Sequence, residues 1–418
     1  MKAIQLTGPN TLDGEVDVQG SKNAALPILA AAVMIPGISM IHNCPKIVDI
    51  YHMINIMEHI GCKTKWEDHT LIVDATLVKK TKLPKEYVKA MRSSVVMMGP
   101  LLARCGEITL YYPGGCVIGE RPIDIHQSAL ECLQVKFETG EDTIYANVRE
   151  LTGSDIHMSF PSVGATQNAI LAAVLAKGCS VIYGGAVEPE VTELVAFLKQ
   201  AGADIVLTKR KEYVIHGVKK LHGTEFTIVS DRIVAGTYLM AGVATRGKIL
   251  LHHAPVCQME KVLNTLEKLG AKLTVEGEDL YLSAAQAGKP LMHLETSVYP
   301  GFPTDLQSPL MAVLSLAGGV STVSERIFEK RFDVVKELNQ MGADIQVQGN
   351  SALVCGVRQL SGKLVEAKEL RGGAALVIAG LCAHGETRIL GYPFIERGYE
   401  DICRDIGMMG GKIASLEV

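Results

Sequence analysis

The sequence predicts an α/β protein of two similar domains, each made of three βαβαββ repeats. Three observations support this fold class. An amphipathic helix recurs at regular spacing, a second and almost wholly apolar helix recurs out of phase with it, and short alternating strands separate the two. The chain has 418 residues, which fits one large domain or two to three ordinary ones.

The amphipathic helix ends in a turn at the same point of every repeat. The turn residues stand at positions 61, 134, 202, 270, 342 and 410, so successive copies lie 68 to 73 residues apart. The residue is glycine in five copies and Gln134 in the second, and glycine is the usual residue of a helix C-terminal turn. Alternating strands, such as the one expected at 279–282, follow.

The second helix of each repeat begins at polar or charged residues and continues as a run of small apolar ones. The body at 169–176 is apolar on nearly every side, so we expect it to be buried on most sides. A glycine and a β-branched strand come next. The expected helix starts lie near 21–23, 91–94, 162–165, 230–232, 303–305 and 370–373.

Composition excludes several classes of function. The net charge is −4, from 41 basic and 45 acidic residues, and without a basic tail or charge run we expect neither a nucleic-acid nor a membrane partner. Ten scattered cysteines without a CxxC pair favour a reducing, cytoplasmic setting over disulfides or a zinc site. The first six residues read as a strand, not a signal peptide. Phosphate-binding glycine fingerprints are missing, so no nucleotide cofactor is expected.

Basic residues stand at several of the expected helix starts. A lone arginine there is usually a solvated surface residue, and acidic residues would complement the helix dipole better. Repetition at equivalent points instead indicates an anion site, because helix N-termini present unpaired N–H groups to anions. We therefore expect a cleft between the two halves that binds a polyanionic substrate. The residues concerned are Lys22, Arg92, Arg232 and Arg371, joined on nearby loops by Arg121, Arg331 and Arg397.

One loop, at 113–126, concentrates reactive side chains. It follows a strand expected at 107–112 and is interrupted by Gly114, Gly115 and Gly119. Cys116 stands at its expected tip. A free cysteine is usually a small buried hydrophobic residue, but mobile loops with reactive side chains are frequent active-site lids.

These segments resemble those of a known family. The chain is similar over essentially its whole length to the UDP-N-acetylglucosamine 1-carboxyvinyltransferases, the enolpyruvyl transferases of bacterial peptidoglycan synthesis. The resemblance rests on the segments 20–24, 91–94, 113–126, 162–166, 299–305 and 397–400.

The resemblance implies a fold and a domain division. The family has two similar domains of three βαβαββ units around buried parallel helices, an inside-out α/β barrel, and its N-terminal strand packs with the C-terminal domain. We therefore expect one domain at 22–229 and a second formed by 1–21 with 230–418.

The resemblance also implies a reaction. The family transfers the enolpyruvyl group of phosphoenolpyruvate to the 3′-hydroxyl of UDP-N-acetylglucosamine and releases phosphate, without a cofactor or a metal. Cys116 matches the family's proton donor, and an ordinary thiol is mostly protonated at neutral pH. Fosfomycin is the family's known inhibitor class. Asp305 matches the carboxylate that accepts the sugar proton. An N-cap role at its helix start is the alternative interpretation, and both roles are compatible. Lys22 and Arg397 complete the expected catalytic set.

The remaining site residues follow by family position. Lys22, Arg121, Arg331, Arg371 and Arg397 are expected to hold the phosphate and carboxylate charges. The nucleotide-sugar site is expected to comprise Asn23, Arg92, Pro122, Ile123, Asp124, Ile125, His126, Ser162, Val163, Gly164 and Ile327. His126 would, without the motif, be read as a loop-packing residue. Glu369 stands where the family often has aspartate, which leaves its role open.

Two rival functions are weighed against this one. The shikimate-pathway enolpyruvyl transferase shares the fold and phosphoenolpyruvate, but it lacks the thiol-bearing loop. A non-catalytic paralogue that binds nucleotide sugar is disfavoured by the intact Lys22, Cys116, Asp305 and Arg397. Oligomeric state cannot be read from the sequence.

Overall fold

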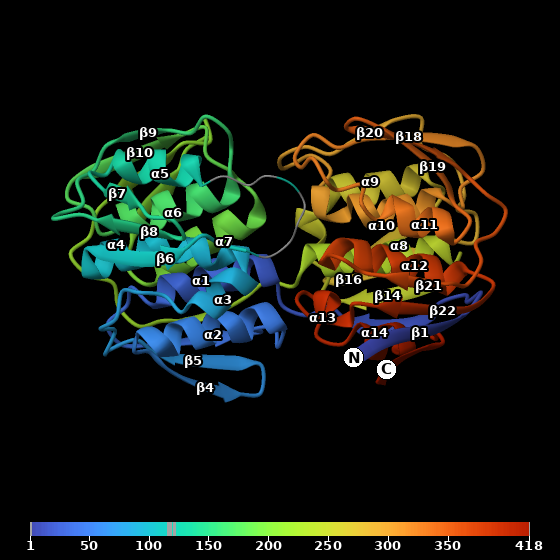
Figure 1. Ribbon diagram of the computed structural model, residues 1–418, viewed down its shortest axis with the longest axis horizontal. Coiled ribbons are helices and arrows are strands. Elements are labelled where there is room, and N and C mark those ends of the chain that lie inside the picture. The colour runs from blue at the N-terminus through green and yellow to red at the C-terminus, as the bar shows by residue number, and fades with distance from the viewer. Residues whose placement is uncertain (1, 115–118, 120–122, 418) are drawn as a thin grey trace. The chain divides into compact units, whose positions relative to one another are not determined.

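The chain folds into two compact units, shown in the computed structural model of Figure 1, which describes residues 2–114, 119 and 123–417. The first unit contains the described residues of Gly20–Cys116 and Arg121–Val229, and the second mainly those of Met1–Gln19 and Ser230–Val418. Helices and strands alternate throughout both units, so the predicted α/β class is confirmed.

The strands of the first unit form three sheets. Their strand orders are β13-β3-β5-β4, β6-β8-β7 and β11-β12-β10-β9. The strands are β3 (Ile38–His42), β4 (Lys63–Glu67), β5 (Thr70–Asp74), β6 (Glu107–Tyr111), β7 (Lys136–Thr139), β8 (Thr143–Asn147), β9 (Asp155–His157), β10 (Cys179–Tyr183), β11 (Asp204–Leu207), β12 (Tyr213–His216) and β13 (Glu225–Thr227). The strand expected at 107–112 is thus present as β6.

Three further sheets belong to the second unit, in the orders β15-β16-β14-β2, β17-β18-β20-β19 and β21-β22-β1-β23. Strand β1 pairs with β22 and β23, which places the start of the chain beside its end. The strands are β1 (Lys2–Gly8), β2 (Asp13–Asp17), β14 (Lys248–His252), β15 (Lys272–Glu276), β16 (Asp279–Ser283), β17 (Leu294–Glu295), β18 (Val320–Ser324), β19 (Asp344–Gln348), β20 (Ser351–Cys355), β21 (Leu364–Glu366), β22 (Gly385–Leu390) and β23 (Ile413–Glu417).

The apolar helices of each unit are buried, as their composition requires. Every residue of α12 except Cys382 is buried, and α8 is buried from Ile233 to Val243. Each begins within two residues of its expected start. They are α1 (Lys22–Ala32), the 3₁₀ helix η1 (Arg92–Met97) continuing as α4 (Met98–Cys105), α6 (Val163–Ala173), α8 (Arg232–Ala244), the 3₁₀ helix η3 (Thr304–Leu306) continuing as α10 (Gln307–Leu314), and α12 (Leu370–Cys382).

The amphipathic helices cover the units on the outside and end at the predicted turns. All six turn residues have positive φ, from 75° at Gln134 to 116° at Gly61. A non-glycine residue rarely adopts this conformation, so Gln134 is a costly choice there. The helices are α2 (Val48–Ile60), α5 (Asp124–Glu131), α7 (Pro189–Gln200), α9 (Glu260–Lys268), α11 (Val335–Gln340) and α14 (Ile402–Met408); the short α3 (Lys85–Ala90), η2 (Val256–Gln258) and α13 (Tyr392–Ile395) connect other elements.

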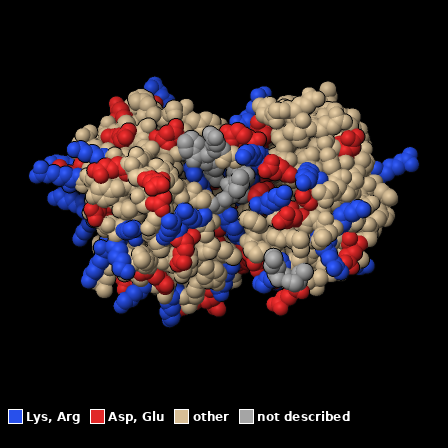
Figure 2. All heavy atoms as spheres, in the orientation of Figure 1, with Lys and Arg blue, Asp and Glu red and all other residues tan. Residues whose placement is uncertain are grey.

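Each unit has a hydrophobic core of its own, built mainly from its buried helices. Figure 2 shows basic and acidic side chains interspersed over the face that it draws, in keeping with the mixed charge of the sequence. Among the described residues, no helix is both long enough and apolar enough to cross a membrane.

Candidate active site

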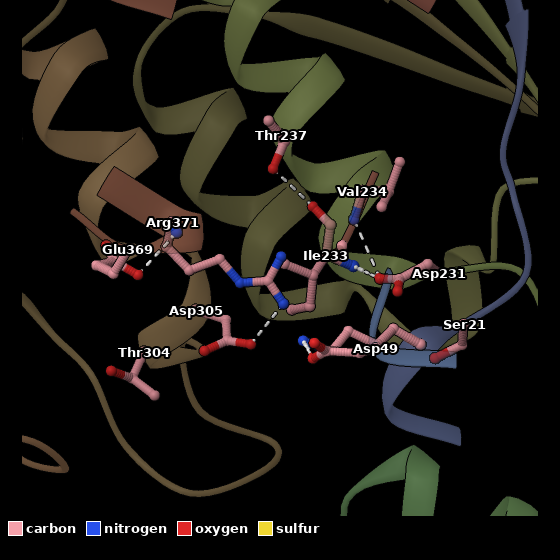
Figure 3. Close-up of polar contacts among 12 residues, drawn as sticks. Ser21, Asp49, Asp231, Ile233, Val234, Thr237, Thr304, Asp305, Glu369 and Arg371 are labelled. Carbon is pink, nitrogen blue, oxygen red and sulfur yellow. Dashed lines mark hydrogen bonds and ion pairs between the residues drawn. The ribbon is translucent and has the colours of Figure 1, made fainter. Parts of the chain in front are cut away.

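The helix starts of the second unit bring three of the predicted site residues together. Asp305 lies in the first turn of η3, which leads into α10, and Arg371 is the second residue of α12. Arg331 follows β18 by seven residues. Figure 3 shows the Arg371 guanidinium pointing at the Asp305 carboxylate. The starts of α10 and α12 therefore lie at the same end of the unit.

The Asp305 carboxylate forms ion pairs with two guanidiniums. Arg331 Nη2 donates to Asp305 Oδ1 at 2.5 Å, and Arg371 Nη2 donates to Asp305 Oδ2 at 2.7 Å. Both arginine side chains are only 4% exposed, whereas the Asp305 side chain is 24% exposed. Charge-assisted bonds of this kind are among the strongest in proteins. The carboxylate thus faces solvent with two buried cations behind it.

Arg371 is charged in this setting. Burial is the largest single influence and would lower the pKa of its guanidinium, but Asp305, Tyr399 and Asp231 together outweigh burial, and the pKa lies above its usual value. The buried Tyr399 hydroxyl lies within hydrogen-bonding reach of the same guanidinium. Tyr399 is held in turn by Thr237 of α8, whose Oγ1 lies 2.8 Å from the phenol oxygen.

Glu369 is the N-cap of α12. Its side chain accepts hydrogen bonds from the backbone N–H groups of Arg371, at 2.8 Å, and of Gly372. Its Oε2 also lies 3.5 Å from Arg331 Nη1. The longer side chain at this position therefore fixes the start of α12 and contributes a second acidic contact to Arg331.

Asp305 itself is not an N-cap. Pro303 occupies the N-cap position of η3, and the Asp305 carboxylate binds arginines. The alternative interpretation of Asp305 as a helix cap is therefore wrong. Thr304, beside it, donates to Glu325 Oε2 at 2.9 Å, and the other Glu325 oxygen accepts from the backbone N–H of Ile327 at 2.8 Å. Glu325 thus ties Ile327, expected in the nucleotide-sugar site, to the start of η3.

In the first unit, Lys22 forms a buried ion pair. Lys22 is the first residue of α1, and its Nζ lies 2.7 Å from Asp49 Oδ2 of α2. The side chain of Asp49 is 1% exposed and that of Lys22 is 12% exposed. The α1 N-terminus is capped by Ser21, whose hydroxyl accepts from the backbone N–H of Ala24. The ammonium is therefore fixed at a capped helix start.

His126 packs against the start of α6. Its Nδ1 lies 2.8 Å from Asn168 Nδ2, and because an amide nitrogen donates, Nδ1 accepts. A Cβ added to Gly164 would lie 3.0 Å from the His126 ring, so a larger residue there would require the ring to shift. Ser162 is the N-cap of α6 and accepts from the Ala165 N–H. The packing interpretation of His126 describes these contacts, and its role in substrate binding stays a prediction.

The other predicted residues of the first unit occupy similar helix starts. Arg92 begins η1, Asn23 is the second residue of α1, and Val163 begins α6. Ile123 is the buried N-cap of α5, with the exposed Asp124 and half-buried Ile125 in its first turn. In the second unit, the half-buried Arg397 follows α13. Cys116, Arg121 and Pro122 lie outside the described residues.

Sequence reasoning missed two acidic residues of this arrangement. Asp49 and Glu325 are both buried and both organise predicted site residues. The only sequence signal for Asp49 is a carboxylate within the otherwise apolar face of α2, which is unusual for a buried residue. Within the described residues, no cluster of His, Cys, Asp and Glu could hold a metal ion.

Comparison with known proteins places the chain in a family. A family model for EPSP synthase (3-phosphoshikimate 1-carboxyvinyltransferase) matches residues 6–406. The chain is 44% identical to UDP-N-acetylglucosamine 1-carboxyvinyltransferase 2 of Caldanaerobacter subterraneus over 416 residues, which cover 100% of each chain. It is 40% identical to UDP-N-acetylglucosamine 1-carboxyvinyltransferase 1 of Staphylococcus aureus, again over 100% of each. The chain belongs to the UDP-N-acetylglucosamine 1-carboxyvinyltransferase family.

Solved structures agree on the fold of this UDP-N-acetylglucosamine 1-carboxyvinyltransferase family member. The enolpyruvyl transferase NikO from Streptomyces tendae superimposes with a TM-score of 0.89 at 24% identity, covering 99% of this chain and 98% of that one. EPSP synthase from Acinetobacter baumannii gives a TM-score of 0.77 at 16% identity, with 100% of both chains covered. At these identities the likeness concerns the fold alone.

Proposed function

We propose that this protein transfers the enolpyruvyl group of phosphoenolpyruvate to the 3′-hydroxyl of UDP-N-acetylglucosamine and releases phosphate. The observation that carries the proposal is Asp305, a partly exposed carboxylate backed by two buried guanidiniums. The arrangement offers what the reaction needs at one point: an acceptor for the hydroxyl proton and cations for the anionic partner.

The addition step uses these groups in sequence. Asp305 accepts the proton of the sugar 3′-hydroxyl, and the sugar oxygen forms a bond to C2 of phosphoenolpyruvate. Cys116 supplies a proton to C3, so that the double bond becomes the single bond of a tetrahedral adduct. In the elimination step, C3 returns a proton to the Cys116 thiolate, the double bond reforms, and the C2–O bond to phosphate breaks. The phosphate leaves with the proton that Asp305 had taken from the sugar hydroxyl, so both groups regain their starting states. Atoms and charges balance without a metal or a redox cofactor.

Cations hold the reacting phosphate and carboxylate. Lys22, Arg331 and Arg371 are each fixed by an ion pair with a carboxylate, which limits the reorganisation needed when a substrate binds. Arg121 and Arg397 complete the set. Because Asp305 occupies Arg331 and Arg371, the anion of the substrate must exchange with it, and this exchange would leave the carboxylate available as the base.

The nucleotide sugar is assigned to the helix starts of the first unit and to one loop of the second. Capped starts such as that of α6 present N–H groups suited to anionic phosphates. The residues assigned to this site are Asn23, Arg92, Pro122, Ile123, Asp124, Ile125, His126, Ser162, Val163, Gly164 and Ile327.

The finer architecture belongs to the same proposal. We infer that the two domains, 22–229 and 1–21 with 230–418, each form an inside-out α/β barrel of buried parallel helices within outer sheets. The shared end of the α10 and α12 starts supports the parallel arrangement. A cytoplasmic location and the absence of nucleic-acid and membrane partners stay predictions.

Phosphate release tests the substrate assignment. The protein is incubated with phosphoenolpyruvate and either UDP-N-acetylglucosamine or shikimate 3-phosphate, and released phosphate is measured. We expect release with the nucleotide sugar only. Release with shikimate 3-phosphate alone would assign the chain to the other branch of the fold family, and release with neither would refute catalysis.

A further inference from the structure

The side-chain amide of Gln19 binds the loop that carries Arg397 at two points. Gln19 Nε2 donates to the Gly398 carbonyl at 3.2 Å, and Gln19 Oε1 accepts from the Glu400 backbone N–H at 2.9 Å. The Gln19 backbone carbonyl accepts from the Asp231 N–H at 2.8 Å. One half-buried residue near the start of the chain therefore links this loop to the N-cap of α8.

The loop is also fixed by its contacts with the buried helices. A Cβ on Gly398 would lie 2.6 Å from Leu370 Cδ2, so the loop lies directly against the first residue of α12. Tyr399 is buried, and its hydroxyl lies 2.8 Å from Thr237 Oγ1. Only Gln19, among these partners, holds the loop backbone by hydrogen bonds on both sides of Tyr399.

We propose that Gln19 is a positioning residue for Arg397. This inference rests on the proposed function, in which Arg397 holds an anionic group of phosphoenolpyruvate. Fixing the carbonyl of Gly398 and the N–H of Glu400 restricts the backbone that carries the guanidinium. A cation fixed before the substrate arrives loses less conformational entropy on binding, so the affinity for the anion is higher.

The test compares Gln19→Ala with Asn10→Ala. Asn10 is a matched control because it is a half-buried amide in the same unit that also ties the start of the chain to its end. Its Nδ2 donates to the Leu381 carbonyl at 3.1 Å, and its Oδ1 accepts from the Lys412 N–H at 2.9 Å. Asn10 Nδ2 also donates to the Thr7 carbonyl at 3.0 Å. Both substitutions therefore remove an amide that is bonded to backbone groups, two for Gln19 and three for Asn10, but only Gln19 touches the Arg397 loop.

Steady-state kinetics give the first measurement. We expect Gln19→Ala to raise the KM for phosphoenolpyruvate about fivefold or more, with kcat changed less than about twofold and the KM for UDP-N-acetylglucosamine unchanged. Asn10→Ala should leave all three constants unchanged. Equal KM values for phosphoenolpyruvate in the two variants would overturn the inference, as would a Gln19→Ala variant indistinguishable from the native protein.

Hydrogen–deuterium exchange gives a second measurement that does not depend on activity. The Glu400 amide should exchange faster in Gln19→Ala than in the native protein or in Asn10→Ala. If the native protein released no phosphate, the proposed function would fail and the exchange result would still decide whether Gln19 fixes the loop. Unchanged exchange at Glu400 would refute that fixation even in an active enzyme.

Discussion

The Asp305 carboxylate and the Arg371 guanidinium lie 2.7 Å apart, where the buried helices α10 and α12 begin. The two residues are 66 positions apart in the chain, and only the packing of the two helix starts brings them into contact. In the proposed reaction one of them accepts a proton and the other holds an anion. Their contact therefore links substrate binding to the availability of the base.

Replacing Asp305 with asparagine separates these roles. Asp305→Asn keeps the shape and an acceptor oxygen but cannot take up the hydroxyl proton, so we expect kcat to fall at least about 100-fold. Calorimetry should show that UDP-N-acetylglucosamine still binds. Glu295→Gln, which breaks the exposed pair with Arg326, is the control and should keep native kcat. A native kcat in Asp305→Asn would exclude this residue as the base.

Tyr399 should matter more for phosphoenolpyruvate than its neighbour Tyr238. Thr237 donates to the Ile233 carbonyl, so the Tyr399 hydroxyl donates to Thr237 and its lone pairs face Arg371. Tyr238 instead donates to Asp405 at 2.6 Å. Each phenylalanine variant loses the hydrogen bonds of one buried hydroxyl, and each buried hydrogen bond contributes about 1 kcal/mol of folding stability.

Only Tyr399→Phe is expected to raise the KM for phosphoenolpyruvate, because only its hydroxyl neighbours Arg371. Thermal unfolding should report similar losses for both variants and so controls for general loosening of the core. A rise in KM of the same size in Tyr238→Phe would show that the effect is one of packing.

Fosfomycin should alkylate Cys116 ahead of the other cysteines. Burial raises the pKa of Cys62, Cys382 and Cys403 to about 12, which suppresses their thiolates and hence their reactivity. Exposed Cys179 and Cys257 serve as internal controls for simple accessibility. Peptide mapping by mass spectrometry should find the adduct at Cys116, and equal labelling of Cys179 or Cys257 would argue against a specially activated thiol.

If Cys116 is the proton donor, its replacements should affect turnover according to their acidity. Cys116→Ser places a much weaker acid at this position and should lose most activity, whereas Cys116→Asp supplies another dissociable acid and should retain activity while resisting fosfomycin. Turnover and inactivation assays on both variants check this. A fully active serine variant would remove the donor role.

The stability of the second unit should fall as pH rises through the titration of Asp405. Burial raises the pKa of this carboxyl above its ordinary value, although Tyr238 and Arg404 donate to it and act in the opposite direction. Between the ordinary pKa and the raised one, the folded protein binds more protons than the unfolded chain, so unfolding becomes easier as pH increases.

Asp405→Asn cannot titrate and should flatten this dependence. Urea unfolding at a series of pH values upward from about pH 4, near the ordinary pKa of an aspartate, measures the effect. It appears as a difference between the native protein and the variant in the slope of unfolding free energy against pH. Identical slopes would mean that Asp405 has the same pKa in the folded and unfolded states.

The repeats were predictable because they depend on local patterns. Turn residues such as Gly61 and Gln134, and helix starts such as Lys22, follow from spacing and hydrophobicity, and the structure places them accordingly. Arg371 was predicted to bind an anion, but its partner Asp305 was not predicted as its counter-ion. The spacing of residues within one repeat does not predict which helix N-termini come into contact in the folded protein.

The acidic residues were harder to assign for the same reason. Asp49 lies within an apolar helix, and its value as the partner of Lys22 depends on two helices packing together. Glu369 was recognised as a departure from the family, but its capping of α12 requires the backbone of Arg371 and Gly372 to be in place. Sequence patterns locate such groups, and tertiary packing decides what they contact.

The product itself tests the central claim most directly. The protein is incubated with UDP-N-acetylglucosamine and ¹³C-labelled phosphoenolpyruvate, and the nucleotide-sugar product is examined by NMR and mass spectrometry. The proposed reaction predicts an enolpyruvyl ether at the sugar 3′-oxygen, one per released phosphate, and none with Asp305→Asn. A label at another oxygen, or phosphate release without a labelled sugar, would contradict it.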